Sequence, residues 1–308
     1  MATIVARKNS TIVRSFMFAG VRTGFAIGSW LRPRATLRHA YRLFCTPLAT
    51  TRQRARAADP AGAAVAYATV AGEQIATYVW GDPATQPHVL LAHGWSSHAL
   101  RFLPWIAPLR EAGYAVVGFD QVGHGRSSGR RTTLPGFAET LRAVARPFGT
   151  AAAVIGHSLG GAATLLALAD GLQAQRAILI APAADPIAAA QRFSRFVGLA
   201  DYLSGRLFDE YEARHPTRVA SLQAHLKAPT IGRPALIVHD LADREVPWQE
   251  GERYARHWPD ARLLTTTGLG HHRIVDDADV INTALRFLRG ETVGERVVSS
   301  PNLPYGFA

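Results

Sequence analysis

Between residues 88 and 266 the chain alternates short apolar runs with patterns typical of helices. The expected strands are 88–92, 115–119, 152–155, 177–181, 235–239 and 262–266. The expected helices are 101–112, 134–148, 159–171 and 277–288, the last with Asp276 as its N-cap. Apolar runs that are continuous rather than alternating indicate a parallel sheet with helices on both faces. We therefore predict an α/β fold, in which reactive groups collect at the carboxyl ends of the strands.

The same patterning predicts how the chain is organised. Residues 65–70 and 74–80 flank the sequence Ala71-Gly72-Glu73 and are expected to form a hairpin. We expect four parts in all: an N-terminal arm, a body, a short helical cap inserted into the body, and a C-terminal tail. Their expected bounds are 1–58, 59–290, 183–233 and 291–308.

The charge of the chain is concentrated in the arm. The formal net charge is +11, which alone would suggest a nucleic-acid partner. Residues 1–58, however, hold 11 basic residues and no acidic ones, and the rest of the chain carries 23 of each. A neutral body lacks the concentrated positive charge that nucleic-acid binding needs, so we expect no nucleic-acid partner. The single cysteine, Cys45, excludes an intramolecular disulfide and a metal site built from cysteines, and we expect it to be inert.

The arm itself has three interpretations. It is a removable targeting segment, a solvated extension, or an amphipathic helix that packs or lies on a membrane surface. The segment 16–31 is the most apolar part, but Arg22 and several glycines interrupt it, so we expect no transmembrane helix. We favour a cytoplasmic protein with peripheral membrane contact through residues 1–58.

A serine follows the expected strand 152–155 in a pattern with a specific geometry. Gly156-His157-Ser158-Leu159-Gly160 fits G-x-S-x-G between a strand and a helix. The tight turn needs small residues two positions either side of the serine, because a Cβ there would collide with neighbouring backbone. The serine is then exposed at a helix N-terminus, which favours developing negative charge. Ser158 is therefore a candidate nucleophile.

A nucleophilic serine needs a base, and the base needs an acid to orient it. Asp243 follows the strand 235–239, and His271 follows the last strand, giving the order Ser, Asp, His. Other residues remain alternatives at this stage. They are Asp240 and Asp185 for the acid, and His272 for the base.

Four motifs in the correct order resemble those of the α/β-hydrolase superfamily over about residues 65–290. They are His93-Gly94-Trp95, the D-x-x-G-H-G-x-S pattern from Asp120 to Ser127, the D-x-x-V-P pattern from Asp243 to Pro247, and Gly270-His271. Within the superfamily, the bacterial esterase-like serine hydrolases are most similar. The resemblance implies the α/β-hydrolase fold and assigns roles by position. Ser158 would be the nucleophile, His271 the base and Asp243 the acid, while the backbone N–H groups of Trp95 and Leu159 would form the oxyanion hole.

The implied activity is hydrolysis of a small-molecule ester or acyl substrate through an acyl-enzyme, without metal or organic cofactor. An acyltransferase or a C–C bond hydrolase would use the same three residues, and a non-catalytic membrane-associated binding module is a weaker alternative. His93, His124 and His157 are expected to be structural. The aromatic and aliphatic residues of the cap, such as Phe193, Phe196 and Val197, pack onto the body or line an apolar wall for an acyl chain. No pattern fixes the acyl-chain length or the oligomeric state.

Overall fold

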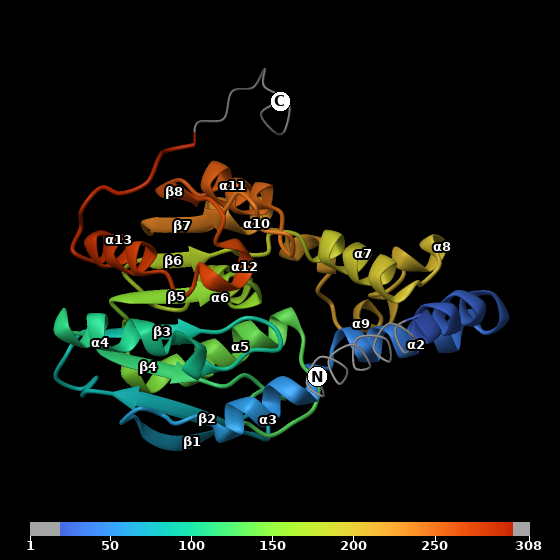
Figure 1. The fold of residues 1–308 in the computed structure, drawn as a ribbon, viewed down its shortest axis with the longest axis horizontal. Helices are drawn as coiled ribbons and strands as arrows, with labels where there is room; N and C mark the ends of the chain where they lie inside the picture. Colours follow the sequence, from blue (N-terminus) through green and yellow to red (C-terminus); the bar gives the residue numbers. More distant parts are fainter. Residues whose placement is uncertain (1–18, 298–308) are drawn as a thin grey trace, which may run out of the picture. The chain divides into compact units, whose positions relative to one another are not determined.

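The computed structural model describes residues 19–297, and the chain folds as two compact units (Figure 1). We call the first the helical unit; it comprises Met1–Cys45 and Pro186–Ser221. We call the second the sheet unit; it comprises Thr46–Asp185 and Leu222–Ala308.

The sheet unit is built on eight strands in the order β1-β2-β4-β3-β5-β6-β7-β8. β1 and β2 form an antiparallel hairpin, and β2 also pairs antiparallel with β4. Every later pairing is parallel, from β3·β4 to β7·β8. The predicted hairpin and the mostly parallel sheet are therefore confirmed. The strands are β1 (Ala64–Val70), β2 (Glu73–Trp80), β3 (His88–Ala92), β4 (Ala115–Phe119), β5 (Ala153–His157), β6 (Ala177–Ile180), β7 (Ala235–Asp240) and β8 (Ala261–Thr266).

Helices cover both faces of this sheet, as predicted. Odd-numbered residues of β3, such as Val89 and Leu91, pack with α4 (Leu103–Glu111) and α13 (Ala278–Leu288). Even-numbered residues, such as Leu90, pack with α5 (Leu134–Ala145) and α6 (Leu159–Ala169). Because side chains alternate across a strand, each continuous apolar run supplies both cores at once. The remaining helices of this unit are α3 (Ala49–Ala57), η1 (Ala99–Phe102), η2 (Arg146–Phe148), α10 (Ala224–Lys227), η4 (Ala228–Thr230), α11 (Trp248–His257) and α12 (Gly270–Arg273).

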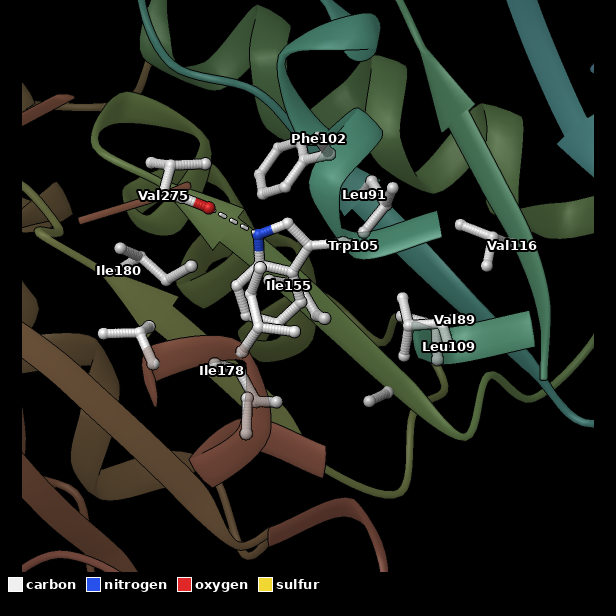
Figure 2. Packing of buried hydrophobic residues seen from close by; sticks show 14 of the residues in the cluster. Val89, Leu91, Phe102, Trp105, Leu109, Val116, Ile155, Ile178, Ile180 and Val275 are labelled. Atoms are coloured by element: carbon white, nitrogen blue, oxygen red, sulfur yellow. Dashed lines mark hydrogen bonds between the residues drawn. The ribbon is translucent and has the colours of Figure 1, made fainter. Parts of the chain in front are cut away.

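Trp105 of α4 lies at the centre of the first of these cores. Its fully buried ring packs among residues of the central strands and of α4, and its indole Nε1–H donates to the carbonyl oxygen of Val275 at 2.7 Å (Figure 2). The donation satisfies a polar group that would otherwise be costly to bury. It also fixes the chain just after α12, the helix that carries His271.

The expected N-cap of the last helix was wrong by one residue. The Asp277 carboxylate, not that of Asp276, accepts hydrogen bonds from the backbone N–H groups of Asp279 and Val280. The Asp276 carboxylate instead pairs with Arg101 at 2.5 Å. An ion-pair partner 175 residues away explains the shift, and no local pattern indicates it.

The helical unit contains the helical residues 19–31, together with α2 (Pro33–Phe44), α7 (Pro186–Val197), α8 (Asp201–Ser204) and α9 (Asp209–Glu212). Its core joins Phe25 and Ala40 to a set from the inserted segment: Ala190, Val197, Leu199, Leu203 and Leu207. The Arg22 guanidinium donates to the carbonyl oxygens of Arg195 and Phe196, both at 2.7 Å. Described residues of the predicted arm and of the predicted cap thus share one hydrophobic core.

The last part of the predicted arm belongs to the sheet unit. Residues 46–58, which include α3, were predicted as part of the arm and lie in that unit. Near the other end, Glu295 makes two backbone hydrogen bonds to Leu263 of β8, each of 2.7 Å. The remainder of the predicted tail, 298–308, lies outside the described residues. The four-part division with bounds at 58, 183, 233 and 290 stays a prediction.

From residue 19 to residue 297, no helix combines the length and the apolarity needed to cross a bilayer.

Candidate active site

Ser158 sits on a strained turn between β5 and α6. Its backbone has φ 54° and ψ −120°, a conformation that residues other than glycine rarely adopt. A Cβ on Gly160 would lie 2.2 Å from the carbonyl oxygen of Ala92, and one on Gly156 would lie 2.7 Å from the carbonyl oxygen of Gly160. Backbone atoms therefore exclude any larger residue at both positions. This is the physical reason for the two glycines of the G-x-S-x-G pattern.

A chain of hydrogen bonds connects Ser158 to His271 and Asp243. The Ser158 Oγ lies 3.0 Å from His271 Nε2, and His271 Nδ1 lies 2.7 Å from Asp243 Oδ2. The first contact fits a hydroxyl that donates to Nε2, and the second fits an Nδ1–H that donates to the carboxylate. The structure brings together the three residues that the sequence predicted as a triad. They come from the carboxyl ends of β5, β7 and β8.

Asp243 is held as a carboxylate. Its Oδ1 accepts from the backbone N–H groups of Glu245 and Val246, at 2.8 and 3.0 Å. Burial alone would raise its pKa, but hydrogen bonds from His239 and His271, and the backbone donor at Val246, hold the pKa well below its usual range. A buried ionised carboxylate beside Nδ1 fixes the imidazole in one tautomer and stabilises the imidazolium that would form.

The alternative residues make other contacts. Asp240 accepts from Thr266 Oγ1 and from the Leu269 N–H, at 2.8 and 2.9 Å, so it braces the loop after β8. Asp185 accepts from Gln223 and Arg253. His272 points to Glu245, with 2.8 Å between Nε2 and Oε1, and its side chain is 67% exposed. None of these hydrogen bonds and ion pairs of Asp240, Asp185 and His272 involves the side chain of Ser158 or His271.

The residues predicted to supply the oxyanion hole are Trp95 and Leu159. Leu159 is the first residue of α6, and Trp95 follows Gly94, where a Cβ would lie 3.0 Å from the Cβ of Ser158. Within residues 19–297, neither N–H has a hydrogen-bond acceptor. Both N–H groups are therefore available as donors, and their role in an oxyanion hole stays a prediction.

Two of the histidines predicted as structural support the loop that contains Trp95. His124 Nε2 accepts from the Ser96 N–H at 3.0 Å, and His93 Nε2 accepts from the Gln121 N–H at 3.0 Å. Burial lowers the pKa of each ring to about 3. Both rings are therefore neutral near pH 7, which their acceptor role requires.

Three side chains hold the backbone that carries His271. His157 Nε2–H donates to the His271 carbonyl oxygen at 2.9 Å, Arg101 donates to that of His272 at 2.7 Å, and Trp105 donates to that of Val275 (Figure 2). The sequence reasoning placed His157 in a supporting role but missed Arg101 and Trp105. Both occupy an ordinary amphipathic pattern, and their partners lie about 170 residues away, so no local signal could identify them.

Arg52 is a further residue that sequence reasoning misplaced. It was counted among the charges of the arm, yet its half-buried guanidinium donates to the carbonyl oxygens of Gly125, Ser127 and Gly129. Gly125 and Ser127 belong to the D-x-x-G-H-G-x-S pattern, and Gly129 follows it by two residues. Burial lowers the pKa of Arg52, as desolvation of a cation must. The same pattern needs Gly125, since a Cβ there would lie 2.0 Å from Asp120 Oδ2.

The chain is similar to several known hydrolases. A family model described as serine aminopeptidase, S33, matches residues 83–228. A protein of Variovorax paradoxus named as a carbamate hydrolase is 27% identical over 243 residues, which cover 66% of this chain and 91% of the relative. A monoacylglycerol lipase of Mycolicibacterium smegmatis is 37% identical over 105 residues, covering 31% of this chain and 37% of the lipase. The crystal structure of an enol-lactonase from Burkholderia xenovorans has a TM-score of 0.57 at 19% identity and covers 73% of this chain and 100% of the lactonase.

The sheet order, the strained serine turn and these matches define the class of protein. The chain belongs to the α/β-hydrolase superfamily. It is a hydrolase of that superfamily, and the sequence-based assignment of the fold is confirmed.

Proposed function

We propose that the protein is a serine hydrolase that cleaves carboxylic esters through an acyl-enzyme. The observation that carries the proposal is the continuous hydrogen-bond chain from Ser158 through His271 to the Asp243 carboxylate. No other pair of acid and base contacts Ser158 among the described residues.

The acylation step follows from the donor and acceptor roles. Ser158 Oγ attacks the ester carbonyl carbon while its proton passes to His271 Nε2, and the carbonyl π electrons move onto oxygen. The N–H groups of Trp95 and Leu159 stabilise this oxyanion, each contributing about 3–4 kcal/mol. Collapse of the intermediate breaks the C–O bond. The alkoxide takes the proton from the imidazolium and leaves as the alcohol, and the acyl group stays on Ser158.

Deacylation repeats the same two steps, addition and collapse, with water as the nucleophile. His271 Nε2 removes a proton from a water molecule, whose oxygen attacks the acyl carbon. The second intermediate expels Ser158 Oγ, which regains a proton from His271, and the carboxylic acid leaves. Throughout, the Asp243 carboxylate keeps Nδ1 protonated and balances the transient charge on the ring.

The relatives support esters as the substrate class. A monoacylglycerol lipase and an enol-lactonase are named for substrates in which an acyl carbon is bonded to oxygen. A relative named as a carbamate hydrolase indicates a second carbonyl electrophile to include in the substrate panel.

A fluorophosphonate probe tests the proposal directly. We expect covalent labelling of Ser158 in the folded protein, and loss of labelling in Ser158→Ala. Ser221→Ala is the matched control, because the Ser221 hydroxyl donates to the Arg218 carbonyl oxygen and not to His271. Labelling of wild type at any other serine would overturn the proposal.

The substrate is then assayed with p-nitrophenyl esters of increasing chain length and with a carbamate analogue. Wild type is expected to turn over at least one ester, and Ser158→Ala none above background. Adding an alcohol acceptor separates hydrolysis from acyl transfer. A carboxylic acid as main product supports the hydrolase, and a new ester as main product identifies an acyltransferase instead.

A further inference from the structure

We propose that the helical unit docks on the surface of an anionic phospholipid bilayer through a patch formed by Ile27, Trp30, Leu31 and Tyr202. We call these four residues the apolar patch. The inference concerns binding alone and does not depend on the proposed ester hydrolysis.

The apolar patch lies opposite the buried face of its helix. Phe25 and Ser29 are buried at i and i+4, so they define the face that packs into the helical unit. Ile27, Trp30 and Leu31 lie on the other side of the same helix and are 54%, 75% and 76% exposed. Large apolar side chains that are this exposed are costly in water when they cluster.

Tyr202 of α8 extends this exposed surface from a distant part of the chain. Its ring lies 5.3 Å from the ring of Trp30, and its hydroxyl donates to the Ser29 carbonyl oxygen. Tyr202 is itself 48% exposed. Tryptophan and tyrosine are the residues that favour the interface between lipid and water, because each joins an apolar ring to a polar group.

The charges beside the apolar patch identify the kind of partner. Arg32, Arg34 and Arg38 follow Leu31 directly along the chain, and all three are exposed. Within residues 19–297 none of them forms an ion pair, and the first acidic residue along the sequence is Asp59. Three other arginines of this unit do form ion pairs: Arg206 with Asp209, Arg214 with Glu210, and Arg218 with Glu212. Unpaired cations beside exposed aromatic and aliphatic side chains match a surface with anionic headgroups over hydrocarbon.

The test measures binding of the full-length protein to vesicles by sedimentation. The vesicles contain phosphatidylcholine alone, or phosphatidylcholine mixed with phosphatidylglycerol. Wild type is expected to bind the mixed vesicles more tightly, with an affinity that falls as salt is raised. Equal binding to both kinds of vesicle, or binding to neither, would overturn the proposal.

Two double variants separate the contributions of the patch and of the charge. Trp30→Ser/Leu31→Ser should abolish measurable binding. Arg34→Gln/Arg38→Gln should weaken binding to mixed vesicles by roughly thirtyfold, since each basic group near an anionic surface contributes about 1 kcal/mol. Their matched controls are Val65→Ser/Tyr67→Ser, which removes exposed apolar side chains of β1, and Arg130→Gln/Arg131→Gln, which removes two exposed cations. The controls should bind as wild type does.

Trp30→Phe keeps the proposal testable if the serine variant fails to fold. Phenylalanine preserves the apolar surface, so binding should persist, while the vesicle-dependent shift in tryptophan emission should be lost. A shift that remains in Trp30→Phe would contradict insertion at the apolar patch. If wild type is a dimer that Trp30→Ser/Leu31→Ser dissociates without any change in vesicle binding, the patch is a contact between copies and the proposal is wrong.

Discussion

The imidazole of His157 donates to the carbonyl oxygen of His271 at 2.9 Å, and the two rings lie 4.8 Å apart. The residue next to Ser158 thus holds the backbone of the proposed base. Burial, followed by the proximity of His271, lowers the pKa of His157 well below its ordinary value. His157 therefore stays neutral, and no second positive charge opposes protonation of His271 during the reaction.

This contact predicts a positioning role for His157. His157→Leu removes the donor and should lower kcat about fivefold with little change in KM, because a lost hydrogen bond of about 1 kcal/mol would loosen the ring of His271. His157→Gln retains an N–H donor and should recover most of kcat. Steady-state kinetics on a p-nitrophenyl ester measures both, and equal losses in the two variants would contradict the role.

The contacts of Asp243 predict that it alone orients His271. Asp243→Asn should lower kcat by about 10⁴, since an amide can hold the imidazole in the wrong tautomer. His272→Gln serves as the control and should retain wild-type kcat, because the side chain of His272 points to Glu245. A larger loss in His272→Gln than in Asp243→Asn would mean that the neighbouring histidine is the base.

The tight turn around Ser158 predicts that one added methyl group at Gly160 lowers the stability of the fold. Gly160→Ala places a Cβ against the carbonyl oxygens of Ala92 and His93, at 2.2 and 2.5 Å. We expect the free energy of unfolding to fall by at least about 1–3 kcal/mol, as in other overpacked sites. Gly232→Ala is the control, because no atom lies within 4 Å of its added Cβ. Chemical denaturation compares the two, and similar midpoints would refute the close approach.

Arg52 predicts that one charge of the N-terminal region stabilises the body. Arg52→Gln would leave at least two buried carbonyl groups without their charged donor. The free energy of unfolding should fall by about 1.5–3 kcal/mol. Arg54→Gln removes an exposed guanidinium of the same helix and should change stability by less than about 0.5 kcal/mol. The difference between the two variants is the measured quantity, and a difference near zero would show that the contacts of Arg52 contribute nothing.

The buried histidines predict acid sensitivity. His93 and His124 have a pKa of about 3 when folded, against about 6.5 in the unfolded chain. The unfolded state therefore binds more protons in this window. Stability should fall as pH drops from about 6.5 towards about 3, by up to about 1.4 kcal/mol per pH unit for each ring. Replacing His124 by Gln should flatten this slope, whereas His215→Gln, at an exposed position, should not. An unchanged slope in the His124 variant would contradict the assignment.

The sheet and the proposed triad could be predicted because their signals are local. Continuous apolar runs such as 235–239 mark buried parallel strands, and the residues after each run lie at one edge of the sheet. The contacts of Arg101, Trp105 and Arg52 could not be predicted, because each partner is a distant backbone carbonyl that any residue type provides. The shared core of residues 19–45 and 186–221 was missed for a similar reason. Apolar residues in each segment show that it packs, but not against what.

The anchors of the His271 loop also determine when activity can arise during biosynthesis. The donors on His157, Arg101 and Trp105 precede their acceptors by 114, 171 and 170 residues. A nascent chain therefore exposes a complete serine turn long before the ribosome has made the base or its supports. Such a chain stays inert until the segment through Val275 has emerged and folded. Activity of the proposed esterase would thus report that the segment through Val275 has been made, and truncation at any point before β8 would leave no active fragment.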